Sequence, residues 1–397
     1  MLRGNKMRIC MLAYTFYESD NRVRRYAETL TKRGDHVDVI VLRKKGQKYR
    51  ESMKGVNIYR IQQRTINESN KLTYLFKILL FLFNSSIFLI LLHTKIRYDL
   101  IHVHSVPDFE VFAAWFPKLF RSKLILDIHD ILPEFYSSKF GSSKNSIIYK
   151  LLILCEKISI HFADHVIISN HIWYKRLLSR SIKKEKCTVI INYPDPSIFY
   201  RRGSIRYKNK FILSYPGTLN YHQGLDIAIK AIALIKDKEP NVEFRIYGEG
   251  PEKQNLLTLV KELELKNYVY FEGLLPMEEI ADALRNVDLG IVPKRKDSFG
   301  NEAFSTKIME FMSLGIPVIA SSTKIDKFYF NSSIILFFKS EDEYDLARKI
   351  LKLKNNKNLR NIIKDEALKF IEKNNWNVKK YEYLDLVDFL VNNRGNL

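Results

Sequence analysis

A helix start lies within the most informative stretch of the sequence, residues 301–321, which reads NEAFSTKIMEFMSLGIPVIAS. Ser305 or Thr306 is a natural N-cap, because a hydroxyl oxygen can accept hydrogen bonds from the first N–H groups of a helix. The spacing that follows predicts a helix as far as Leu314, and Gly315 is typical of the residue just beyond a helix end. The unpaired N–H groups and the positive dipole end of such a start suit a phosphate group.

Three charged side chains flank this helix start. Lys307 lies in the first turn, where its positive charge adds to the attraction for a phosphate. Glu302 and Glu310 are separated by seven residues. Glu302 precedes the helix, where a sugar attached to that phosphate can sit, and Glu310 lies a turn or more inside, where it can accept hydrogen bonds from ribose hydroxyls. Alternatively, both acids are solvated surface carboxylates.

Two series of alternating strands and helices must position these residues. Buried parallel strands read as continuous apolar runs, and alternation with helical stretches predicts a parallel sheet covered on both faces. The fold class is therefore α/β, with two Rossmann-like, doubly wound domains. Ligands of such sheets bind at the carboxyl ends of the strands, here in a cleft between the domains. The first series comprises MRICMLAY, HVDVIVL, LIHVHS, KLILDIH and HVIIS, and the second comprises FILSYPG, EFRIYG, YVYFEG, LGIVP and PVIAS.

The two series are separated by a stretch without periodicity that contains two prolines and a basic run. The sequence therefore predicts an N-terminal domain over residues 1–195, a linker over 196–210 and a C-terminal domain over 211–374. A last helix is predicted over 375–397.

Several motifs resemble those of one known family. Glu-x7-Glu followed by Met-x-Leu-Gly-Ile-Pro-Val resembles the retaining glycosyltransferases of the family 4 type, also called glycosyl transferases group 1, which have the GT-B fold. The resemblance extends over nearly the whole chain and is typical of the bacterial surface-polysaccharide kind. The other motifs similar to the family are YPGTLNYHQGLDIAIKA, FRIYGEGPE, YVYFEGLLPMEEI and LDIHDILPE.

The resemblance implies a role for individual residues. Glu302 would bind the hydroxyls of the donor sugar, and Glu310 would bind the ribose. His129, which follows KLILDI, would approach the donor sugar from the facing domain; the alternative is a hydrogen-bonded core histidine. The last helix, 375–397, would cross back to the N-terminal domain.

The chain departs from the family where the donor diphosphate is held. A separate departure concerns the acceptor side, where Arg22 occupies the region in which the family often has two adjacent glycines. At the diphosphate, Thr218 and Gln223 stand where the family usually carries an Arg and a Lys in its Gly-rich loop. Other groups are then expected to hold the phosphates. The residues predicted to bind the donor are Gly217, Thr218, His222, Gly248, Arg295, Ser305, Thr306, Lys307 and Glu310, with His129 and Glu302 predicted as catalytic.

The predicted reaction needs neither a metal nor a cofactor. The sequence contains no Asp-x-Asp triplet, and backbone amides and Lys307 would stabilise the departing diphosphate. The resemblance implies a nucleotide-sugar donor, expected to be a UDP-sugar, and retention at the anomeric carbon of a hexose-type sugar. The alternatives are another GT-B activity, such as a sugar-nucleotide epimerase, and a non-catalytic nucleotide-sugar-binding protein.

Charge and hydropathy point to a membrane-held acceptor. Residues 1–200 carry a net charge of +16 (33 basic against 17 acidic side chains), out of +21 for the whole chain. A basic half suggests an anionic membrane surface, whereas a Lys-rich composition would need no partner. No nucleic-acid-binding module is recognised. The acceptor is expected to be lipid-linked or an oligosaccharide, and the protein to be cytoplasmic and peripheral on the inner face of the plasma membrane.

The segment Leu72–Leu92 is apolar except for one Thr, one Lys, one Asn and two Ser. Its length suits a bilayer, but the strand LIHVHS follows directly, and a full crossing would divide one sheet between two sides of a membrane. We therefore expect a helix that covers the sheet and partly faces lipid. A fully buried core helix is the alternative.

Overall fold

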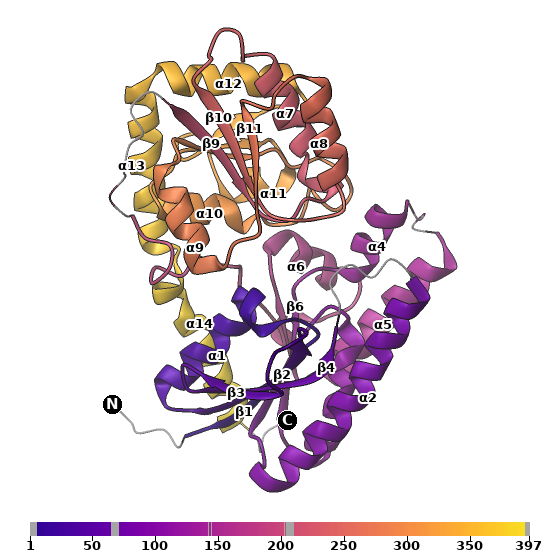
Figure 1. Ribbon diagram of the computed structural model, residues 1–397. Helices are drawn as coiled ribbons and strands as arrows, with labels where there is room; N and C mark the ends of the chain where they lie inside the picture. The colour runs from indigo at the N-terminus through magenta and orange to yellow at the C-terminus, as the bar shows by residue number, and fades with distance from the viewer. Residues whose placement is uncertain are drawn as a thin grey trace. The chain divides into compact units, whose positions relative to one another are not determined.

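The computed structural model describes residues 6–64, 71–141, 143, 145–201, 203 and 210–393, with the backbone alone at residues 71, 72, 139 and 140. The chain forms two compact α/β units (Figure 1), one comprising Met1–Asn192 with Lys380–Leu397 and the other Tyr193–Lys379. Of the linker predicted at 196–210, residues 202 and 204–209 lie outside the described residues. The remainder of it is assigned to the second unit.

The first unit is built on an eight-stranded sheet with the order β3-β4-β2-β1-β5-β6-β7-β8. Every neighbouring pair is parallel except β3 and β4. The strands are β1 (Arg8–Ala13), β2 (His36–Arg43), β3 (Arg50–Met53), β4 (Val56–Gln63), β5 (Leu100–His104), β6 (Lys123–Ile128), β7 (His165–Ile168) and β8 (Cys187–Val189). The central strands are buried along their whole length, which is why they read as continuous apolar runs.

Helices cover both faces of this sheet, as Figure 1 shows, with α1 and α14 on one side and α2 and α5 on the other. The helix α14 begins in the second unit and ends in the first. The helices of this unit are α1 (Asn21–Arg33), α2 (Lys71–Ile96), α3 (Trp115–Leu119), α4 (Leu132–Phe140), α5 (Ile147–Phe162), α6 (His171–Leu178) and α14 (Trp376–Asn392), with the 3₁₀ segment η2 (Asp108–Ala114) between β5 and α3.

The apolar segment predicted from Leu72–Leu92 is the helix α2, and it is not a fully buried core helix. Over the part Thr73–Ile96 it is long and apolar enough to cross a membrane, but only 22% of its most apolar window is buried. The strands that precede and follow α2, β4 and β5, belong to the same sheet. The helix therefore covers the sheet with one face and leaves the other uncovered within the described structure.

The second unit contains a six-stranded sheet, entirely parallel, with the order β11-β10-β9-β12-β13-β14. The chain winds outward from β9 in one direction through β10 and β11, and from β12 in the other. The order therefore reverses between β9 and β12, where doubly wound sheets bind their ligands. The strands are β9 (Phe211–Pro216), β10 (Val242–Tyr247), β11 (Val269–Gly273), β12 (Leu289–Val292), β13 (Val318–Ser321) and β14 (Leu336–Phe338).

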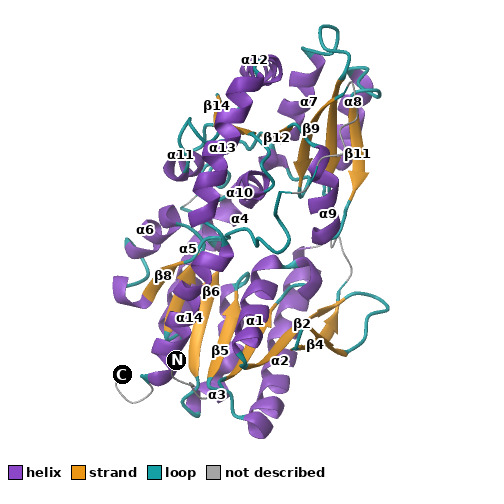
Figure 2. Ribbon diagram, turned by 90° about the vertical axis from the view of Figure 1, so that its left-hand side faces the viewer, coloured by secondary structure: helices purple, strands orange, loops and turns teal. Residues whose placement is uncertain are grey.

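Helices enclose this second sheet as well, so each unit consists of layers of helix, sheet and helix (Figure 2). One apolar core joins the sheet to α7, α8 and α12. The helices are α7 (Leu225–Ala233), α8 (Lys253–Glu262), α9 (Met277–Ala283), α10 (Thr306–Ser313), α11 (Lys324–Tyr329), α12 (Glu343–Asn355) and α13 (Lys357–Lys373). The two series of alternating elements predicted from the sequence are thus two Rossmann-like sheets.

Candidate active site

The helix predicted at the centre of residues 301–321 is α10, which begins at Thr306 with Ser305 as its N-cap residue. The Ser305 side chain does not cap the helix. Its hydroxyl oxygen is buried and has no hydrogen-bond partner among the described residues. The first N–H groups of α10 therefore stay available to a ligand.

Lys307 extends from this helix start across the carboxyl end of β9. A Cβ added to Gly217, which follows β9, would lie 2.2 Å from Lys307 Cε and 2.9 Å from Nζ. The ammonium group also lies 5.2 Å from the centre of the Tyr215 ring. Gly217 has φ +144°, a conformation that residues with a side chain rarely adopt. The structure thus brings Gly217 next to Lys307 and the start of α10; that these residues bind the donor stays a prediction.

The Gly-rich turn after β10 closes against the same loop. Gly248 has φ +152°, and a Cβ there would lie 1.9 Å from the carbonyl oxygen of Gly217. The Gly217 N–H donates to the carbonyl oxygen of Tyr247 at 2.8 Å. The two glycines therefore let the loops after neighbouring strands lie in contact, next to Lys307.

The environment of Lys307 leaves its charge responsive to pH. Burial lowers the pKa of Lys307 to about 8; the nearby Glu310 carboxylate opposes this decrease, and the Lys294 ammonium adds to it. A phosphate bound there would favour the charged form. The group is thus poised to gain a proton with an anionic ligand.

The two acids of the motif differ in their surroundings. Glu302 is only 7% exposed, and its carboxylate pairs with the Lys324 ammonium at 3.1 Å. The alternative of a solvated surface acid is therefore wrong for Glu302. Glu310 is half-buried, four residues into α10. Whether either acid binds sugar or ribose stays a prediction.

A buried ion pair that sequence reasoning missed holds the segment before α10. The Lys294 ammonium donates to the Ala303 carbonyl at 2.6 Å and pairs with the Asp326 carboxylate at 3.1 Å. The signal was available, because Lys294 follows the apolar strand LGIVP at the end where ligands bind.

Arg295, another predicted donor residue, is engaged elsewhere. Its guanidinium donates two hydrogen bonds to Asp226 at 2.6 and 2.7 Å and one to Glu341 at 3.1 Å, and it stacks over the Tyr221 ring at 4.2 Å. The Arg295 N–H donates to the carbonyl oxygen of His222. These contacts connect the loop after β12 to the loop after β9. Because they already engage the Arg295 guanidinium, they favour Lys307 over Arg295 as the diphosphate ligand.

The remaining predicted residues of this unit lie in the same loop after β9. Thr218 is exposed, and its carbonyl oxygen accepts a hydrogen bond from the Tyr215 hydroxyl at 3.0 Å. His222 lies beside Phe299, with 5.6 Å between ring centres, and burial lowers the pKa of His222. Burial therefore favours the neutral imidazole, which can hydrogen-bond to a phosphate.

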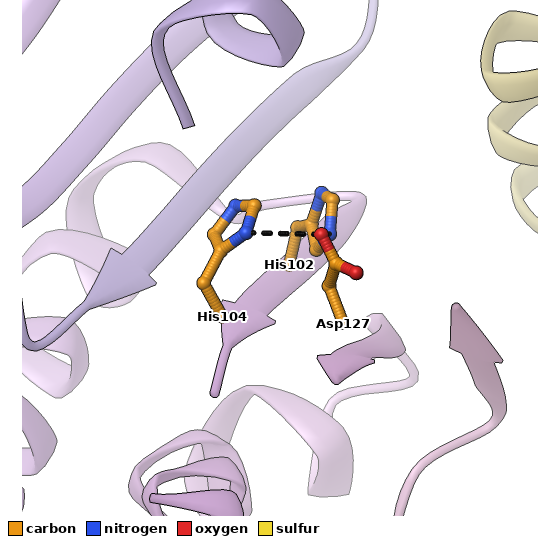
Figure 3. Close-up of side chains that lie close together, drawn as sticks. All are labelled: His102, His104 and Asp127. Atoms are coloured by element: carbon orange, nitrogen blue, oxygen red, sulfur yellow. Dashed lines mark ion pairs between the residues drawn. The ribbon is translucent and has the colours of Figure 1, made fainter. Parts of the chain in front are cut away.

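In the first unit, His129 belongs to a network at the carboxyl ends of β5 and β6. Its Nε2 lies 3.1 Å from His104 Nδ1 and 3.3 Å from Asp127 Oδ2, while 20% of its side chain remains exposed. The His102 and His104 rings stack with 4.1 Å between centres. Figure 3 shows these two imidazoles beside the Asp127 carboxylate. His129 is therefore hydrogen-bonded, as the alternative reading of the sequence expected, but not fully buried; its approach to the donor sugar stays a prediction.

Arg22 supplies the cation of this network. Its Nε and Nη2 donate to both Asp127 oxygens at 2.7 and 2.8 Å, and its Nη1 donates to the Ile190 carbonyl and to Asn192 Oδ1. Burial alone would raise the pKa of Asp127, but the Arg22 guanidinium and the neighbouring imidazoles hold that pKa well below its usual value. Asp127 is therefore ionised at neutral pH, next to the His129 ring.

The histidines behind His129 are uncharged. Burial lowers the pKa of His102 and of His104, and the neighbouring imidazole lowers the pKa of His102 further. The His102 Nδ1 lies 2.9 Å from the hydroxyl of Tyr383 in α14. Asp127 and Arg22 thus contribute one negative and one positive charge to the network, and both side chains are buried.

His102, His104 and Asp127 also lie close enough together to be considered as a metal site. No spacing in the sequence indicated this cluster. The arrangement does not fit a divalent cation, because the Arg22 guanidinium already binds both carboxylate oxygens and would lie beside the metal. Histidines at alternate positions of LIHVHS and an acid within KLILDI are the signal that could have revealed the network.

Comparisons with known proteins decide the family. A model of "Glycosyl transferase 4-like domain" matches residues 19–192, and a model of "Glycosyl transferases group 1" matches residues 197–370. The chain belongs to the group 1 glycosyltransferases. It is 28% identical over 257 residues to the O-antigen biosynthesis glycosyltransferase WclY of Escherichia coli, which covers 62% of this chain and 67% of the relative.

Solved structures of other glycosyltransferases share the GT-B fold of this one. Sucrose-phosphate synthase from Thermosynechococcus elongatus matches with a TM-score of 0.79 and 19% identity, over 97% of this chain and 99% of that one. Anabaena Alr3699/HepE in complex with UDP and glucose matches with a TM-score of 0.70 and 16% identity, over 96% and 99%. The predicted family and fold class are confirmed.

Proposed function

We propose that this glycosyltransferase moves a hexose-type sugar from a UDP-sugar to a lipid-linked or saccharide acceptor, with retention, in surface polysaccharide biosynthesis. The observation that carries the proposal is the position of Lys307 and the α10 start against Gly217, at the carboxyl end of β9. This is the place where a doubly wound sheet binds a phosphorylated ligand. An ammonium group and free N–H groups there supply the charge complement of a diphosphate.

The proposed chemistry follows from the leaving group. Breaking the bond between sugar and diphosphate places negative charge on the departing phosphate, and donors fixed in advance stabilise that charge most effectively. Lys307 and the N–H groups of α10 are assigned this task, Glu310 the ribose and Glu302 the sugar hydroxyls. His129 is assigned to the donor sugar, with the Asp127–Arg22 pair holding its ring.

The donor and the pathway are supported by the relatives. HepE has been solved with UDP, and also with UDP-glucose, and WclY is named for O-antigen biosynthesis. A cytoplasmic enzyme on the inner face of the plasma membrane would meet both a nucleotide sugar and a lipid-linked acceptor. The excess of basic residues in the N-terminal half, whose net charge is +16, supports that location.

The first experiment measures thermal stabilisation by UDP, ADP and GDP, for the wild type and for Lys307→Met. A ligand that binds only the folded state stabilises it by about 2.7 kcal/mol at 100 times its Kd. We expect UDP to stabilise the wild type most and Lys307→Met much less. Absence of stabilisation by any of the nucleotides would contradict the proposal.

The second experiment incubates the protein with UDP-hexoses and a saccharide acceptor, and determines the anomeric configuration of the product by NMR. We expect release of UDP and a product with the configuration of the donor. Conversion of the donor sugar without transfer would indicate an epimerase. Tight UDP-sugar binding with no turnover on any acceptor would indicate a binding protein.

A further inference from the structure

The outer face of α2 is an exposed apolar stripe. Phe76, Leu80, Phe83, Ile87 and Leu91 follow one another at intervals of three or four residues, so they share one side of the helix. Phe76 is 66% exposed, Phe83 63% and Leu91 55%. A helix that is apolar all round is normally covered on every side, so this stripe lacks a covering layer within the described structure.

The inner face of α2 is held by the sheet side of the unit. Ile78, Phe81 and Leu89 are buried. The Gln62 side chain of β4 donates a hydrogen bond to the Lys77 carbonyl oxygen, and the Tyr59 and Phe88 rings lie 5.2 Å apart. A crossing of a membrane by α2 would break these contacts, whereas contact with a membrane surface would preserve them.

The helix α5 carries a second stripe of the same kind, which the sequence had not indicated. Ile147, Leu151, Leu154 and Ile158 repeat at helical spacing and are each at least half exposed. The opposite side of α5, with Tyr149, Glu156 and Ile160, is buried. The apolar side of α5 thus points outward, the reverse of an ordinary amphipathic helix.

The two stripes lie on the same side of the first sheet. Both α2 and α5 pack on η2, and α3 packs on α2. The Trp115 indole donates to the Ser86 hydroxyl at 3.0 Å. Trp115, Leu119 and Phe120 are exposed as well. We call the exposed apolar residues of α2, α3 and α5, with Phe120, the α2–α5 face.

The exposed charged side chains on α2 and α5 are all basic, and the Lys118 ammonium of α3 pairs with Asp164, just beyond α5. The helices α2 and α3 contain no acidic residue, and the one acid of α5, Glu156, is buried and paired with Arg180. Exposed cations on and beside these helices are Lys95, Arg97, Arg121, Lys150 and Lys157. Trp115 and Tyr74 add the amphipathic aromatic rings that favour the headgroup region of a bilayer.

We propose that the α2–α5 face inserts into the boundary between headgroups and acyl chains of an anionic bilayer, as two helices lying on the membrane rather than one crossing it. Exposed apolar stripes combined with exposed basic side chains are complementary to an anionic lipid surface. The inference deepens the proposed function. It rests on that function in one respect: an enzyme that acts on a lipid-linked acceptor must contact a membrane.

The experiment uses the full chain and its own tryptophans. Trp173 and Trp376 are 2% and 3% exposed, whereas Trp115 is 47% exposed, so a change of emission on vesicle binding reports on the α2–α5 face. Vesicles of phosphatidylglycerol with phosphatidylcholine are compared with vesicles of phosphatidylcholine alone, across a salt series. We expect a blue shift and quenching by brominated acyl chains with the anionic vesicles, and loss of both in Trp115→Phe.

Two substitutions, Phe83→Glu and Leu151→Glu, place a carboxylate on each stripe. Each is expected to weaken vesicle binding at least about tenfold, because burying one such side chain in an apolar phase is worth roughly that factor. The matched control is Phe389→Glu, since Phe389 is 60% exposed on α14, at the other side of the same sheet. Binding of this control should equal that of the wild type. Stabilisation by UDP, measured on every variant, shows that the fold and the donor site are intact.

Equal vesicle binding by the wild type and both stripe variants would overturn the proposal, as would binding that ignores lipid charge. Binding that survives alkaline carbonate would show a spanning α2 and overturn it too. A wild-type dimer in solution that Phe83→Glu dissociates would assign the face to a second copy of the chain. Failure of the proposed function is distinguished from all of these, because it appears as absence of stabilisation by UDP while vesicle binding is retained.

Discussion

Replacement of Asp127 by Asn tests the buried network beneath His129. The substitution keeps the size and shape of the side chain and removes its charge. Arg22, which is 3% exposed, would keep its bonds to the Ile190 carbonyl and to Asn192 but would lose the carboxylate that neutralises it. A buried cation without its partner is strongly destabilising.

The expected magnitude follows from the number of contacts that survive. Removal of one partner from a buried ion pair costs about 3–5 kcal/mol. The amide oxygen of Asn can still accept one hydrogen bond, so three of the four hydrogen bonds that Arg22 makes can remain, and we expect a cost near the lower end, about 3 kcal/mol. For a unit of this size, this lowers the midpoint of thermal unfolding by about 6–12 °C.

The assay is thermal unfolding of Asp127→Asn, Arg22→Met and the double variant, followed by circular dichroism. The double variant should be less destabilised than the sum of the two single ones by about 1–3 kcal/mol, since it leaves no buried charge unpaired. Asp388→Asn is the matched control, because the Arg33–Asp388 pair in the same unit is partly solvent-exposed, with 24% and 45% of the two side chains exposed. It should cost less than about 1 kcal/mol.

The pH dependence gives an independent check of the sign. Because Arg22 and the imidazoles lower the pKa of Asp127 in the folded state, its stabilising effect is complete above about pH 4–5 and is lost as the pH falls further. The difference in stability between the wild type and Asp127→Asn should therefore shrink in acid. Additive single variants, or a difference that grows in acid, would refute this account of the network.

Three further predictions concern the donor site, and one concerns metals. UDP affinity of the wild type should be full below about pH 8, where Lys307 is cationic, and fall by up to about tenfold per pH unit above it; calorimetry of Lys307→Met should show weaker and pH-independent binding. Gly217→Ala should weaken stabilisation by UDP, because its Cβ would displace the Lys307 side chain and alanine rarely adopts φ +144°, whereas Gly46→Ala, with φ +83° but no atom within 4 Å, should not. Glu310→Ala should raise the Kd for UDP, and Glu302→Gln should reduce kcat more than affinity, as steady-state kinetics would show. Turnover should survive EDTA, and loss of turnover restored by Mg²⁺ or Mn²⁺ would contradict metal independence.

The features that the sequence determined are those with a local physical cause. Apolar runs of strand length predicted the strands because a strand covered on both faces must be apolar throughout. The start of α10 was predicted at the correct residue, although the Ser305 hydroxyl makes no capping hydrogen bond and is left for a ligand. The family motifs placed Gly217, Gly248 and Lys307 in one site, and the close approach between them gives the physical reason for the glycines.

The features that only the tertiary structure decided depend on contacts between distant parts of the chain. The register of β5 against β6 sets His104 opposite Asp127, and the packing of α1 then brings in Arg22, more than a hundred residues earlier. Spacing along the chain does not show that residues so far apart in the sequence contact one another. Arg295 was a candidate phosphate ligand because the usual Arg and Lys of the family are missing, but only the fold shows that Asp226 and Glu341 engage it.

The outward stripes of α2 and α5 show the same limit most clearly. Apolar residues at helical spacing predict that a helix has a face to bury, yet the spacing is the same whether that face meets a sheet, a lipid or a partner. In α2 the apolar residues run round the whole helix, and only the position of the sheet shows which of them are left uncovered. The amino-acid types therefore determined that these helices have apolar faces to bury, and the tertiary structure decided which face remains exposed.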